Sequence, residues 1–125
     1  MAAKAIKDHP NVKCFVGLNA YSAPALLKAL EQAQMLGKVQ IVGFDADPQT
    51  LSGIEAGTVS ASIIQDQFGC GFHTVRILAE NAQGNRSGLP MFQRRTLPVE
   101  VANRENIAAV RGELSKEKPT TQPGS

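Results

Sequence analysis

Short apolar runs alternate with longer segments of helical periodicity along most of the chain. Short apolar runs that are rich in β-branched residues indicate buried strands, whereas apolar positions three or four residues apart indicate amphipathic helices. These criteria predict four strands, at 12–18, 39–44, 60–64 and 94–101. They predict helices ending near residue 9 and at 24–36, 48–56 and 67–82, with one further turn at 103–110. Strands that alternate with helices form parallel sheets, so the predicted fold class is α/β, in a three-layer αβα arrangement.

Capping residues support several of these helix boundaries. Asp47 is suited to the N-cap of the third helix, and Pro48 is tolerated in its first turn because the missing N–H has no partner there. Ser22 is the predicted N-cap of the second helix. Glycines that can adopt a left-handed backbone are expected to end three helices, at Gly37, Gly57 and Gly84.

Three polar residues follow three successive predicted strands, and they form the candidate site. Asn19, Asp45 and Gln65 each stand at a strand end. Ligands of open parallel sheets bind beyond the carboxyl ends of the strands. Amides donate and accept hydrogen bonds, and a carboxylate accepts from two hydroxyls, so the set suits a neutral polyhydroxylated ligand such as a sugar. The alternative is that each residue only caps a loop, because Asn and Asp favour such turns anyway.

Composition narrows the class of protein. A chain of 125 residues has room for one core, and a formal charge of +2 with scattered Lys and Arg argues against nucleic-acid binding. No apolar run is long enough to insert into a membrane, and the first ten residues lack the apolar core of a secretory signal.

We expect Cys14 and Cys70 to be buried thiols rather than a disulfide. Residues 111–125 are expected to form a disordered tail.

Enzymatic interpretations are weaker. Asp45-Ala46-Asp47 after an apolar strand is similar to the DxD motif of haloacid-dehalogenase phosphatases, but Pro48 follows directly and no acidic pair appears downstream. The segment Gly69-Cys70-Gly71 lacks the third glycine of a dinucleotide-binding fingerprint. We therefore predict no enzymatic activity, no catalytic residue, no metal and no cofactor.

The chain resembles the C-terminal half of type I periplasmic sugar-binding proteins, with the ribose-binding proteins closest in pattern. The resemblance covers residues 8–110 and rests on three places: the strand leading to Asn19, the block IVGFD-x-x-P, and the strand running into Gln65. It implies that Asn19, Asp45 and Gln65 hydrogen-bond sugar hydroxyls, and that Gln65 lies at a hinge. An acid often follows the Asn in this family, whereas Ala20 stands here, and Tyr21 is a further candidate for ligand contact.

The resemblance implies a partial fold, consisting mostly of one of the family's two lobes. Residues 1–110 would form the C-terminal lobe, except that 67–93 would belong to the other lobe. The implied partners are a sugar and, through a full-length parent, the permease of an ABC transporter, with the parent in the periplasm or outside the cytoplasm. Two alternatives remain: the effector-binding half of a lactose-repressor-type regulator, and an oligomerising module that binds no ligand.

The helix predicted at 67–82 carries an apolar stripe that a single lobe would leave exposed. Its members include Phe68 and Phe72. Because large exposed apolar patches promote association, we expect a homo-oligomer, with this segment exchanged between protomers.

Overall fold

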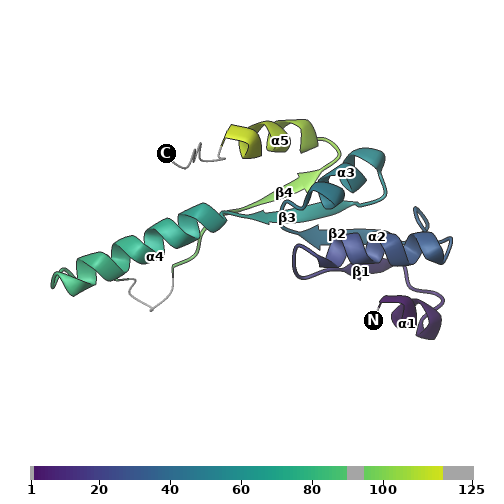
Figure 1. Cartoon of the computed structure of the whole chain (residues 1–125), viewed down its shortest axis with the longest axis horizontal. Helices are drawn as coiled ribbons and strands as arrows, with labels where there is room; N and C mark the ends of the chain where they lie inside the picture. The colour runs from purple at the N-terminus through teal and green to yellow at the C-terminus, as the bar shows by residue number, and fades with distance from the viewer. Residues whose placement is uncertain (1, 90–94, 117–125) are drawn as a thin grey trace, which may run out of the picture. The chain divides into compact units, whose positions relative to one another are not determined.

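The computed structural model describes residues 2–89 and 95–116, and Figure 1 shows an α/β chain. The elements follow one another in the order α1 (Ala2–Asp8), β1 (Cys14–Val16), α2 (Ser22–Gln32), β2 (Gln40–Phe44), α3 (Pro48–Ala56), β3 (Ala61–Gln65), α4 (Gln67–Ala82), β4 (Val99–Asn103) and α5 (Ile107–Lys116). The sequence therefore predicted the fold class and the order of elements correctly. Within the described part of the chain, no helix is long and apolar enough to span a membrane.

The strands form one sheet in the order β1-β2-β3-β4. β1 pairs with β2 in parallel, with Phe15 opposite Ile41, and β2 pairs with β3 in parallel, with Gly43 opposite Ser62. Helices flank the sheet: α2 packs on β2 and contacts both α1 and α3, while α3 contacts α5. The parallel pairing brings the carboxyl ends of β1 and β2 to the same edge of the sheet.

The chain divides into two compact units. The first unit combines residues up to Ile63 with those from Val101 onward, and the second unit runs from Ile64 to Glu100. The first unit is therefore discontinuous in sequence. Its apolar core draws on both of its segments and includes Leu30, Ile41, Ile54, Val59, Ala102 and Val110.

The third helix is formed as its sequence predicts. Asp47 has an extended backbone, and its Oδ1 accepts hydrogen bonds from the backbone N–H of Gln49 at 2.8 Å and of Thr50 at 3.3 Å. Pro48 occupies the first turn, and Gly57 ends the helix with a left-handed φ of 77°. α4 also has the predicted bounds, and the side chain of Asp66 caps it by accepting from the N–H of Gly69 at 2.6 Å.

The predicted boundaries of α2 were wrong at both ends. Tyr21, not Ser22, is the N-cap, and its side chain makes no capping hydrogen bond. Ser22 lies inside the helix and donates to the side chain of Asn19 instead. The helix ends at Gln32, because Gln34 already has a left-handed φ of 55°, and Gly37 (φ 78°) lies in the turn that leads to β2.

The predictions for the last third of the chain need larger corrections. The final strand covers Val99–Asn103 and begins only after Pro98, whose missing N–H cannot join a ladder. We expected one turn at 103–110 and a disordered tail from residue 111. The structure instead has a helix, α5, that continues to Lys116. Ile107 and Val110 of this helix are buried in the core. Two predicted segments lie partly outside the described residues. They are the tail, from residue 117 onward, and the loop and strand around residues 90–94.

Both cysteines are exposed free thiols, contrary to the expectation that they are buried. Cys14 lies on β1, an edge strand on which Val16, two residues further along, is also 58% exposed. Alternate residues of a strand point to the same face. The apolar sequence around Cys14 therefore belongs partly to an uncovered face of the sheet.

Gly43 allows the close approach of two helices to β2, and this yields a stability prediction. A Cβ atom at position 43 would lie 3.1 Å from both Ala23 Cβ and Thr50 Cγ2. We expect Gly43→Ala to lower the free energy of unfolding by about 1–3 kcal/mol, as overpacking of a filled core does. Urea denaturation followed by circular dichroism measures this change.

The matched control is Gly112→Ala in α5, where an added Cβ would meet no atom within 4 Å. Because Ala favours a helix over Gly, this variant should be unchanged or more stable by up to about 1 kcal/mol. Equal midpoints for Gly43→Ala and the unmodified chain would show that the helices can move apart at this point without cost.

Candidate functional site

Asp45 follows the last residue of β2 and has an unusual backbone. Its φ of 65° lies in the left-handed region, which residues other than glycine adopt rarely and at a cost of roughly 1–3 kcal/mol. Two hydrogen bonds hold this conformation. The N–H of Asp45 donates to the carbonyl of Ile63 at 2.8 Å, and the carbonyl of Asp45 accepts from the hydroxyl of Ser62 at 2.7 Å. Both peptide groups that flank the Asp45 Cα are thus anchored to β3.

The carboxylate of Asp45 has an unused acceptor. Its Oδ1 atom is buried and accepts no hydrogen bond from any residue that the structure describes. A buried carboxylate oxygen without a donor is costly, because it has lost its water without gaining a partner.

Asn19 lies in the loop after β1, at the same edge of the sheet as Asp45. Its side-chain oxygen accepts from the hydroxyl of Ser22, and its backbone carbonyl accepts from the Ser22 N–H at 3.0 Å. The side-chain bond identifies the acceptor end of the amide and leaves its NH₂ group to donate elsewhere. The loop is tight: Gly17 donates to the Val42 carbonyl at 2.9 Å, and a Cβ at position 17 would clash with Ser22 Cβ at 2.5 Å.

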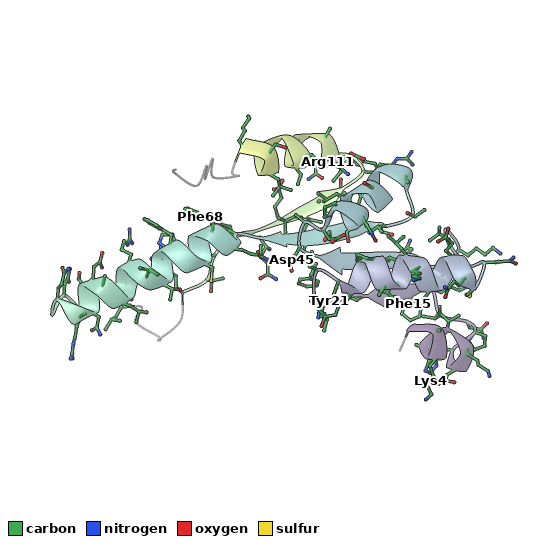
Figure 2. All side chains as sticks on the ribbon, viewed as in Figure 1. Lys4, Phe15, Tyr21, Asp45, Phe68 and Arg111 are labelled. Atoms are coloured by element: carbon green, nitrogen blue, oxygen red, sulfur yellow. The ribbon has the colours of Figure 1, made fainter. Side chains whose placement is uncertain are left out.

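Of the other two predicted site residues, Tyr21 belongs to the same unit as Asn19 and Asp45, and Gln65 belongs to the second unit. Tyr21 is 74% exposed and, as Figure 2 shows, lies at the same end of the first unit as Asp45. Gln65 is exposed and is the last residue of β3, so its position at a strand end is as predicted. It belongs to the second unit, whereas Asn19, Tyr21 and Asp45 belong to the first. The structure therefore groups three of the four candidates at one sheet edge.

The side chains at the site are hydrogen-bonding groups. Asp47, the second acid of the segment Asp45-Ala46-Asp47, caps α3 through its side chain. Over residues 2–89 and 95–116, no three His, Cys, Asp or Glu side chains gather as a metal site would require. A fixed carboxylate and an oriented amide together accept from and donate to hydroxyl groups.

Sequence reasoning missed Ser62 and the true role of Ser22. Ser62 is fully buried in the middle of an apolar strand. The only signal available was this small polar residue within the run SASII. A buried hydroxyl is nearly always hydrogen-bonded, but the pattern does not reveal to what.

Comparisons with known proteins show which proteins the chain is similar to. The D-allose-binding periplasmic protein of Escherichia coli (strain K12) is 26% identical over 80 residues, which are 64% of this chain and 26% of that protein. The crystal structure of GanP, a glucose-galactose binding protein from Geobacillus stearothermophilus, superposes with a TM-score of 0.74 at 28% identity, over 84% of this chain and 36% of that one.

A further solved structure shows the same fold. It is an ABC transporter solute-binding protein from Agrobacterium vitis bound to α-D-tagatopyranose, with a TM-score of 0.75 at 21% identity, over 88% of this chain and 38% of that one. The chain thus spans about a quarter to two fifths of the length of these relatives. The family model described as "Periplasmic binding protein domain" matches residues 2–86, and the chain belongs to that family.

Proposed function

We propose that this chain supplies one side of a sugar-binding site in the solute-binding component of an ABC transport system. The observation that carries the proposal is the half-buried Asp45, which two hydrogen bonds to β3 hold in a left-handed backbone at the carboxyl end of β2. In this proposal Asp45 accepts from sugar hydroxyls and the NH₂ group of Asn19 donates to them. Gln65 adds a further amide contact, and the exposed ring of Tyr21 packs against the ligand.

We extend the proposal to the activity, the location and the partner of the protein. Two relatives are named as binding proteins for allose and for glucose and galactose, and a solute-binding protein of the same fold was solved with α-D-tagatopyranose bound, so we propose a non-enzymatic role here. We also propose a periplasmic or extracytoplasmic location for the parent protein, and a permease as its partner. Residues 67–93 would belong to the second lobe of a longer binding protein, and the separation of Ile64–Glu100 as its own unit supports this assignment.

A titration of the ¹⁵N-labelled chain followed by NMR tests the sugar proposal. We expect D-allose, D-glucose, D-galactose or D-tagatose at millimolar concentration to shift the amide signals of Asn19, Asp45 and Ala46. Because a partial site makes only part of the hydrogen bonds to a ligand, affinity should be weak, on the order of 1 mM. L-leucine serves as the control ligand and should shift none of them. Unmoved signals with all four sugars would refute sugar binding by this chain.

We further propose that the chain self-associates through α4. Its apolar stripe, at positions 68, 72, 75, 79 and 82, repeats every three and four residues, which is the spacing of a helix that packs along another helix. Phe68 is 76% exposed and Phe72 is 54% exposed, and their rings stack with centroids 6.3 Å apart. A second copy would cover this stripe, either directly or by exchange of the segment between protomers.

A further inference from the structure

In the proposed site, Asp45 contacts the ligand from an unfavourable, left-handed backbone conformation. We propose that Ser62 is the positioning residue of this site: its hydroxyl, donated to the Asp45 carbonyl, locks the left-handed turn that aims the carboxylate. This inference rests on the proposed function for its consequence in binding, but the structural role of Ser62 is testable without any ligand.

Ser62 is well placed for this role. It is fully buried on β3, opposite Gly43 in the neighbouring strand, and its hydroxyl lies 2.7 Å from the carbonyl oxygen of Asp45. The next residue on β3, Ile63, accepts the N–H of Asp45 at 2.8 Å. These two bonds fix the peptide groups before and after the Asp45 Cα, and therefore both of its backbone dihedral angles.

The ladder bond and the hydroxyl bond have different roles. The bond from the Asp45 N–H to Ile63 is the kind that ordinary pairing of β2 with β3 provides. The Asp45 carbonyl has a different partner: it accepts from a side chain, the hydroxyl of Ser62. Without Ser62 the peptide group after the Asp45 Cα would lose the partner that holds the φ of 65°. Asp45 is then free to return to the more populated negative-φ regions, and its side chain leaves the site edge.

A neighbouring hydroxyl provides a matched control. Thr50 on α3 is also fully buried, and its Cγ2 would lie 3.1 Å from a Cβ atom at Gly43. Its Oγ1 has no hydrogen-bond partner among the described residues. Thr50→Val therefore removes a buried hydroxyl at nearly constant volume without touching Asp45.

A double-mutant cycle tests the positioning role by stability alone. Glycine adopts a positive φ without penalty and its carbonyl keeps the bond to Ser62, so in the Asp45→Gly background Ser62→Ala costs the whole bond. With Asp45 present, loss of the bond lets the backbone return to negative φ and recovers part of the cost of the left-handed conformation. We therefore expect Ser62→Ala to lower the melting temperature at most about half as much with Asp45 present as in the Asp45→Gly background. Ser62→Cys, which keeps the volume but donates weakly, should behave as Ser62→Ala does. Equal shifts in both backgrounds would overturn the inference, because the two residues would then act independently.

Spectra and binding complete the test. The amide of Ala46 shares its peptide group with the Asp45 carbonyl, so its ¹⁵N signal should be among the most shifted in Ser62→Ala and nearly unmoved in Thr50→Val.

The affinity for the best-bound of the four sugars should fall about fivefold in Ser62→Ala, the equivalent of one hydrogen bond, and less than twofold in Thr50→Val. Equal losses in both variants would count against Ser62 as a positioning residue. Failure of the unmodified chain to bind any sugar would refute the proposed function, while the cycle would still decide the role of Ser62.

Discussion

Replacing Asp45 by Ala should weaken sugar binding at least tenfold. The carboxylate is the only charged group among the four proposed contacts, and hydrogen bonds to a charged acceptor are worth roughly 1.5–3 kcal/mol, against about 1 kcal/mol for neutral ones. A loss of about 1.4 kcal/mol already corresponds to a factor of ten in the dissociation constant. The NMR titration measures the change in the 125-residue chain, and calorimetry measures it in a longer protein that contains it.

Two further substitutions separate loss of the carboxylate from other effects. Asp45→Asn keeps the shape and the tolerance of a left-handed backbone but removes the charge, so it should lose affinity with little change in stability. Glu31→Ala removes an exposed acid near the far end of α2 and should bind as the unmodified chain does. Unchanged affinity in Asp45→Ala would remove this residue from the site.

The second large effect concerns assembly. The double substitution Phe68→Ser with Phe72→Ser should weaken self-association more than 100-fold, because aromatic residues at the centre of an interface each contribute roughly 2 kcal/mol or more. Light scattering after size-exclusion chromatography should then show a mass close to the 13.3 kDa of one chain, whereas we expect a multiple of it for the unmodified protein.

Leu89→Ser is the control for this experiment. Leu89 is 45% exposed and lies beyond the end of α4, so the substitution removes a comparable apolar group from outside the stripe. Its mass should remain that of the oligomer. A mass of one chain for the unmodified protein at high micromolar concentration would contradict self-association through α4.

The elements that the sequence predicts best are those determined by local interactions. α3 has its cap, its proline and its terminal glycine within the eleven residues 47–57, and both of its ends are as predicted. α5 shows the opposite case. It continues to Lys116 with help from partners far away in sequence: Arg111 pairs with Glu55 at 2.9 Å and donates to Ser52 at 3.0 Å. No pattern within residues 107–116 contains that information.

The candidate site was predictable to a similar extent. A polar residue after an apolar strand can be recognised in the sequence, and this criterion selected Asn19, Asp45 and Gln65 as candidates. The positive φ of Asp45 and the hydrogen bond from Ser62 depend on the pairing of β2 with β3, which brings together residues that are seventeen positions apart. The exposure of Cys14 likewise depends on which side of the sheet is covered, and this is a property of the assembled fold.

The discontinuity of the first unit has a consequence for synthesis. A ribosome releases the segment up to Ile63 first, then all of Ile64–Glu100, and only afterwards the stretch that holds Ala102, Ile107 and Val110. Chains fold as they emerge, from the N-terminal end. The core of the first unit is therefore incomplete while the second unit is synthesised. During this interval apolar residues of the first unit would be exposed and available to a chaperone. The final step of folding would be the docking of α5 against α3.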